Sequence, residues 1–95
     1  MYELRFHRKV DKELADLPIE VRKKVKYEFF PSLSESSTIG KPLSGALSGV
    51  WKLSFRASNT DYRIAYEIDD SNKVVYIIMV GKREGFYERL KRRLS

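Results

Sequence analysis

The chain has 95 residues, a net charge of +6 and no cysteine. This length suits one domain, and we treat residues 1–95 as a single domain. Because 42% of the residues are hydrophobic and 34% are charged, the composition excludes a disordered chain and a membrane protein. Small secreted domains usually carry disulfides, so the lack of cysteine favours a reducing compartment. We therefore expect a cytoplasmic protein that has no membrane partner.

The N-terminal third predicts one strand and two helices. Apolar residues alternate with polar ones over residues 2–6, which is the period of a half-buried strand. From Lys9 the spacing becomes helical, and Leu17-Pro18 breaks this helix because the residue before a proline avoids the α-helical conformation. A second helix follows, and we expect Pro31 to end or kink it. The apolar stripe of this second helix consists of Val21, Val25 and Phe29.

The rest of the chain predicts a loop, three strands and a short helix. Serine and glycine are frequent from Ser32 to Gly49, which is typical of a connecting loop. Three apolar runs separated by short polar turns predict antiparallel hairpins. These runs span residues 51–56, 62–68 and 74–80. The last run does not alternate, so we expect a central strand that is covered on both faces. A short helix is expected within residues 82–95.

The predicted elements follow the order β-αα-βββ-α, which indicates a small α+β domain. We expect a twisted, mainly antiparallel sheet. The N-terminal helical hairpin should cover one face of this sheet, and the C-terminal helix should be short. The order of the strands in the sheet stays open at this point.

Alternation places several cations on one face of the predicted sheet. Lys52, Ser54 and Arg56 share a face because a strand has a period of two. Pairing within the hairpin would add Arg63, and Arg83 follows the third strand. Cations bind phosphates and aromatic rings stack on unpaired bases, so this surface predicts an RNA partner. The alternative is that these are ordinary exposed residues, since lysine and arginine are common on strands and protect their edges.

The groups available for catalysis are lysine, arginine and tyrosine. Cleavage of RNA by its 2′-hydroxyl needs a base, a cation that stabilises the transition state, and a proton donor for the leaving 5′-oxygen. Arginine suits the second role, and tyrosine can donate a proton or stack on a base. No histidine or carboxylate cluster has metal-ligand spacing, so we expect no metal and no cofactor. Further candidate RNA contacts are Arg56, Lys82, Phe86 and Arg89.

Four short segments, in this order and spacing, carry a family resemblance over essentially the whole chain. They are Lys41–Gly45, Val50–Leu53, Asp61–Ile68 and Val80–Tyr87. With these segments the sequence resembles the RelE/ParE superfamily of bacterial and archaeal toxins. The resemblance implies the toxin of a toxin–antitoxin pair, with a RelB-like antitoxin as its cognate partner. RelE-type members cut mRNA codons in the ribosomal A site without a metal, which implies the ribosome with its mRNA as a second partner.

The resemblance also implies roles for individual residues. Lys52 would help to activate the 2′-hydroxyl, and Arg63 would stabilise the transition state. Arg83 would donate a proton or stabilise charge, and Tyr87 would stack on or orient the substrate. The best-known RelE has a second lysine where this sequence has Ser54. ParE-type members share the fold and poison DNA gyrase, so the alternatives are a non-enzymatic gyrase inhibitor and a catalytically weak RNA-binding member.

Overall fold

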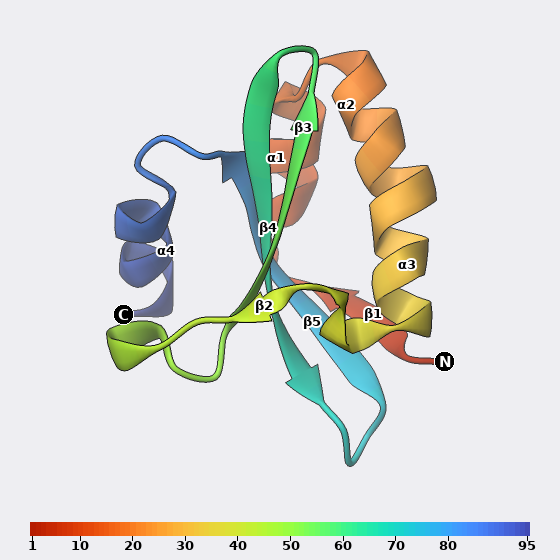
Figure 1. Cartoon of the computed structure of the whole chain (residues 1–95), viewed down its shortest axis with the longest axis vertical. Helices are drawn as coiled ribbons and strands as arrows, with labels where there is room; N and C mark the ends of the chain where they lie inside the picture. Colours follow the sequence, from red (N-terminus) through yellow and green to blue (C-terminus); the bar gives the residue numbers. More distant parts are fainter.

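A five-stranded sheet lies between two helical layers in the computed structural model, which describes residues 1–95 (Figure 1). The strands are β1 (Glu3–Phe6), β2 (Lys41–Pro42), β3 (Trp51–Ala57), β4 (Thr60–Asp69) and β5 (Val74–Lys82). They are arranged in the order β1-β5-β4-β3-β2, in which only β1 and β5 run parallel. The predicted α+β class with a mainly antiparallel sheet is therefore confirmed.

Three helical segments near the N-terminus cover one face of the sheet, and α4 (Phe86–Leu94) covers the other (Figure 1). The N-terminal segments are α1 (Val10–Asp16), α2 (Ile19–Lys24) and α3 (Phe30–Glu35). As expected, Pro18 separates α1 from α2. No helix is both long enough and apolar enough to span a bilayer.

The second helix does not end at Pro31, because a π-helical turn (Val25–Phe29) joins α2 to α3. A proline inside an α-helix clashes with the carbonyl four residues before it, and the wider π turn relieves this crowding. The turn also rotates the buried face. Phe30 and Leu33 are fully buried, whereas Phe29 is only partly buried. The predicted apolar stripe is therefore correct at its start and displaced by one residue after the turn.

The segment from Ser32 to Gly49 is not a plain loop, which corrects the sequence-based expectation. Its first four residues complete α3. Farther along, Lys41 and Pro42 pair with Lys52 and Trp51 and form the edge strand β2. A proline is tolerated there because an edge strand leaves one side of its backbone unpaired. Two 3-10 turns flank this strand, at Ser37–Ile39 and Gly45–Leu47.

Strand β5 is covered on both faces, as the sequence predicts, and it contains a bulge. Ala65 pairs with Met79 and Tyr66 pairs with Ile77, so Ile78 has no partner on β4. A bulge adds one residue to a strand and interrupts the alternation of its side chains. Ile78 and Met79 therefore both pack beneath α4, in a cluster completed by Leu47, Val50, Ala65, Phe86 and Leu90.

An ion pair joins α1, β5 and α4 at this bulge. Strand β1 ends opposite Ile77, so beyond that point β5 is paired with β4 on one side and has no neighbouring strand on the other. There the Val80 amide donates to Glu13 Oε1 at 3.1 Å, and Arg93 donates to the Ile78 carbonyl at 2.9 Å. Arg93 and Glu13 bind each other through two hydrogen bonds of 2.7 and 3.0 Å, with side chains only 12% and 22% exposed. The pair thus satisfies the open edge of β5.

We expect Glu13→Ala to lower the free energy of unfolding by about 2–3 kcal/mol, because it leaves the poorly exposed Arg93 guanidinium without its counter-charge and the Val80 amide without an acceptor. Urea unfolding followed by circular dichroism measures this change. Glu28→Gln is the matched control, since Glu28 forms an exposed ion pair with Lys24. It should leave the unfolding curve almost unchanged. Equal effects of the two substitutions would contradict the role assigned to Glu13.

Candidate functional site

The cations of β3 and β4 lie on the sheet face beneath α4. In the antiparallel register, Ser54 pairs with Arg63 and Arg56 pairs with Asp61. Paired residues point to the same face of a sheet, and Lys52 shares that face two residues along β3. The structure therefore brings together the cations that alternation predicts. It adds one carboxylate, that of Asp61, to the same surface.

Tyr87 connects the first turn of α4 to these cations. The Arg63 guanidinium carbon lies 4.7 Å from the centroid of the Tyr87 ring, and Lys52 Nζ lies 6.0 Å from it. Both distances suit cation–π contacts. Neither cation forms an ion pair with an acidic side chain. Two uncompensated positive charges therefore converge on one aromatic ring.

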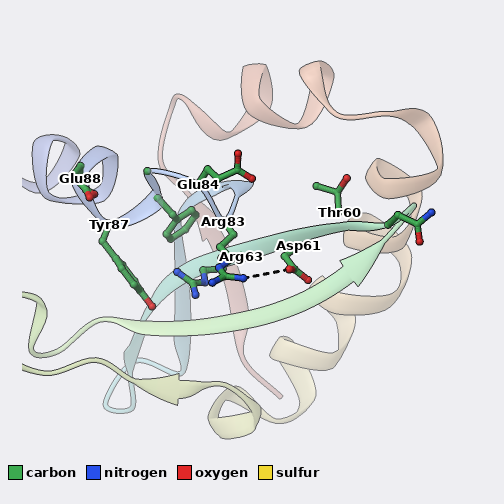
Figure 2. Close-up of a pocket in the computed structure, with 10 residues that line it drawn as sticks. Thr60, Asp61, Arg63, Arg83, Glu84, Tyr87 and Glu88 are labelled. Atoms are coloured by element: carbon green, nitrogen blue, oxygen red, sulfur yellow. Dashed lines mark ion pairs between the residues drawn. The ribbon is translucent and has the colours of Figure 1, made fainter.

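A glycine lies opposite Arg63 on β5, and the Arg89 guanidinium approaches it closely, because a Cβ atom at Gly81 would lie 3.1 Å from Arg89 Nη2. Gly81 of β5 pairs with Arg63, so no side chain from that strand covers the Arg63 guanidinium. Arg83 lies two residues farther along the chain, and in Figure 2 it points toward the same space as Arg63. The amide of Arg83 donates to the Asp61 carbonyl at 2.9 Å, which fixes its backbone. Its guanidinium lies 3.6 Å from the Asp61 carboxylate.

Two cavities lie on either side of this group. The first, of about 560 Å³, extends from the β3–β4 turn to the start of α4, and Tyr87 and Arg63 line it (Figure 2). The second, of about 370 Å³, lies over Ser54 and Arg56. Both cavities share Asp61, Arg63 and Arg83. The predicted catalytic residues Arg63, Arg83 and Tyr87 thus line one cavity. Lys52 lies near the Tyr87 ring but lines a separate cavity beside Gly40 and Lys41.

The four predicted RNA contacts have different environments. Arg56 is exposed and lines the second cavity. Lys82 is exposed, but it pairs with the buried Tyr62 and so points to the opposite face of the sheet from Arg63. Phe86 is 1% exposed and packs in the core beneath α4, so its ring cannot stack on a base. We leave Phe86 out of the RNA-binding surface for that reason.

Arg89 holds the loop that carries Arg83. Its guanidinium donates to the carbonyls of Glu84 at 2.6 Å and Lys82 at 3.1 Å. Gly85, with φ of 64°, has the left-handed conformation that lets the chain turn into α4 over this guanidinium. The contacts of Arg89 are therefore internal, and they set the position of the site rather than extend its surface.

Tyr66 supports the start of β3 from the opposite face. It is fully buried, donates to the Ser37 carbonyl at 2.8 Å and accepts from the Gly40 amide at 3.1 Å. Burial raises the pKa of the Tyr66 hydroxyl, although the Gly40 hydrogen bond opposes this shift. A Cβ atom at Gly40 would overlap both this hydroxyl and the Lys52 carbonyl. Tyr66 is thus a structural tyrosine, whereas Tyr87 is the tyrosine of the site.

Sequence reasoning missed Asp61 as part of the site, and it assigned Arg89 to RNA contact, whereas the guanidinium of Arg89 binds carbonyls of the loop before α4. The signal for Asp61 was present, because a two-residue turn at Ser58–Asn59 places Asp61 directly opposite Arg56. Reading the turn as four residues long hid this pair of opposite charges. Nothing in the spacing of Arg89 shows that its guanidinium turns back toward the loop before its own helix.

The site can bind phosphates and stabilise developing negative charge. Its groups are a lysine, several arginines and a tyrosine hydroxyl. No three histidine, cysteine or carboxylate side chains come together in the structure as metal ligands would. Arginine remains charged at any physiological pH and presents several donors to a phosphate.

A family model described as "ParE-like toxin of type II bacterial toxin-antitoxin system" matches residues 4–91. The toxin RelE of Mycobacterium tuberculosis is 36% identical over 63 residues, which cover 66% of this chain and 61% of that protein. The chain thus spans less than two thirds of that relative. The mRNA interferase toxin RelE of Escherichia coli is 32% identical over 83 residues, which cover 87% of this chain and 84% of that protein.

Solved structures of similar proteins share the fold. A mutant of the E. coli toxin RelE in the free state superposes with a TM-score of 0.77 at 31% identity, covering 99% of this chain and 98% of that one. The toxin–antitoxin complex RelBE2 of M. tuberculosis gives a TM-score of 0.73 at 35% identity, covering 86% and 98%. The intact E. coli RelBE complex gives 0.73 at 31%, covering 88% and 99%.

We expect Arg89→Met to speed amide hydrogen exchange at Arg83 and Phe86, whose amides form the hydrogen bonds of the loop. Exchange followed by NMR measures this residue by residue. Arg92→Met is the matched control, because Arg92 is an exposed arginine of the same helix. It should leave those rates unchanged. If both variants exchange like the wild type, Arg89 does not hold the loop.

Proposed function

The chain belongs to the family of ParE-like toxins of type II toxin–antitoxin systems, and we propose that it is an mRNA endoribonuclease that blocks translation by cleaving codons in the ribosomal A site. We take residues 1–95 as one toxin domain. Its relatives in M. tuberculosis and E. coli are named as RelE toxins, and the E. coli protein is named an mRNA interferase.

One observation carries the proposal. Lys52 and Arg63 both lie within cation–π distance of the Tyr87 ring, and neither has an acidic partner. Uncompensated charges of like sign raise the energy of a folded protein unless an anion is bound between them. The phosphodiester of RNA supplies that anion, and the partly buried Tyr87 ring offers a surface for the adjoining base.

Each residue has a role in the proposed reaction. Lys52 removes the proton of the 2′-hydroxyl, which then attacks the neighbouring phosphorus and displaces the 5′-oxygen. Arg63 stabilises the negative charge that grows on the phosphate. Arg83 stabilises the leaving oxygen or protonates it, and Tyr87 orients the nucleotide. Ser54 has no amine, so Lys52 is the single lysine of β3 on this face.

The site is open and shallow, which favours a substrate that another macromolecule holds in place. Positioning of the reacting atoms can supply roughly 7–11 kcal/mol of a reaction barrier. We propose that the ribosome provides this positioning by holding the mRNA in an in-line geometry. This partner places the protein in the cytoplasm. No cofactor takes part in the proposed reaction.

We further propose a RelB-like antitoxin as the cognate partner. The similar toxins of E. coli and M. tuberculosis have been solved in complexes with their antitoxins. An acidic or amphipathic segment would neutralise the surface around Lys52 and Arg63. Binding of such a segment would compete with RNA for the same charges.

We expect Arg63→Ala to reduce cleavage of A-site codons by about 100-fold or more, because the transition state loses its stabilising cation. Primer extension on mRNA in programmed ribosomes measures the new 5′ ends. Arg92→Ala removes an exposed arginine outside both cavities and should cleave like the wild type.

Two results would contradict the proposed function. The first is full cleavage by Arg63→Ala with an unchanged thermal unfolding curve. The second is a wild-type protein that leaves ribosome-bound mRNA intact at stoichiometric concentration. A supercoiling assay on the same preparation then tests the gyrase alternative, in which inhibition occurs without cleavage of RNA.

A further inference from the structure

Asp61 lies between two arginines at the centre of the cationic surface. Its Oδ1 accepts a hydrogen bond from Arg56 Nη1 at 3.1 Å, and its Oδ2 lies 3.6 Å from Arg83 Nη1. The Asp61 side chain is 41% exposed. It is the one carboxylate that pairs with cations of the two cavities.

The two arginines are held unequally. Arg56 also donates to the Asn59 carbonyl at 3.3 Å, so the β3–β4 turn fixes its guanidinium. The Arg83 side chain makes no hydrogen bond, and its contact with Asp61 is only electrostatic. The N–H donors of Arg83 therefore remain available. The guanidinium of Arg56 is fixed in position, and its donors are bound to Asp61 and to the Asn59 carbonyl.

A carboxylate and a phosphate bind guanidinium groups in the same way, through oxygens that accept its N–H donors. The carboxylate of Asp61 thus occupies the place that a phosphate between Arg56 and Arg83 would take. The cavity of about 370 Å³ beside it has room for this group. An exposed ion pair contributes little to stability, so an incoming phosphate can displace the carboxylate.

We propose that Asp61 closes a second phosphate-binding subsite, which a neighbouring phosphodiester of single-stranded RNA enters by displacing the carboxylate from Arg56 and Arg83. The inference rests on the proposed function, because it assigns a place to the phosphate next to the one at Arg63 and Tyr87. In the empty protein, the carboxylate lowers the affinity for loose RNA. For an RNA strand that a partner holds in register, displacing the Asp61 carboxylate costs free energy once, and the phosphate then contacts both Arg56 and Arg83.

The test is the binding of a fluorescent single-stranded RNA whose 2′-hydroxyls are methylated, so that binding is measured without cleavage. Fluorescence anisotropy is recorded at several salt concentrations. Asp61→Asn should bind about three- to tenfold more tightly at low salt, and the slope of log affinity against log salt should steepen by about 0.7, the value for one more phosphate contact. Asp61→Glu keeps the charge and should bind like the wild type.

Two further variants separate the subsite from net charge. Glu67→Gln removes one negative charge from the same strand, outside both cavities. An affinity gain as large as that of Asp61→Asn would overturn the proposal. Adding Arg56→Ala to Asp61→Asn should abolish the gain, and a gain that persists in this double variant would overturn it as well.

The binding experiment distinguishes a failure of the proposed subsite from a failure of the proposed nuclease activity. If wild-type protein does not cleave mRNA but Asp61→Asn shows the expected gain, the subsite stands and the proposed function fails. If cleavage occurs and Asp61→Asn binds like the wild type, the subsite is rejected and the function stands. Thermal unfolding checks each variant, and Asp61→Ser replaces Asp61→Asn in the same titration if the latter does not fold.

Discussion

The ion pair between Glu13 and Arg93 is the interaction on which the geometry of the site depends. The bulge at Ile78 and the early end of β1 leave backbone groups of β5 without strand partners, and this pair satisfies two of them. Because Arg93 belongs to α4, the same contact fixes that helix against the sheet. The first turn of α4 carries Tyr87, so the aromatic ring beside Arg63 is positioned from the far end of its own helix.

The cations of the site fall into two groups, those without an acidic partner and those paired with Asp61. Lys52 and Arg63 are left without acidic partners, which makes their surface ready for an anion. The Asp61 carboxylate instead partly compensates the positive charges of Arg56 and Arg83. The Arg89 guanidinium lies within the loop, where backbone carbonyls satisfy it and it adds little to the outer surface. Arginine thus occurs in three environments: without an acidic partner at Arg63, paired with Asp61 at Arg56 and Arg83, and bound to backbone carbonyls at Arg89.

Alternation was sufficient to predict β3, β4 and the shared face of Lys52 and Arg56, and pairing of the two strands as a hairpin added Arg63 to that face. The candidate catalytic residues came from the family motif, and the structure places Arg63, Arg83 and Tyr87 around one cavity with Lys52 near the Tyr87 ring. Spacing could not reveal the π turn before Pro31 or the bulge at Ile78, because each inserts one residue and shifts the periodicity on which the prediction depends. Phe86 shows the same limit, since an aromatic residue next to cations resembles a stacking platform until its burial is known.

The unpartnered charges at Tyr87 also affect the folding equilibrium of the protein. Their mutual repulsion is relieved whenever an anion occupies the cleft, so a polyanion that binds only the folded chain adds to its stability in proportion to the logarithm of its concentration. The proposed activity and the stability of the fold are therefore opposed at this surface. A substitution that neutralises Lys52 or Arg63 should raise the free energy of unfolding and abolish the proposed activity. An anion bound beside Lys52 and Arg63 would therefore contribute to the stability of the folded chain as well as occupy the site.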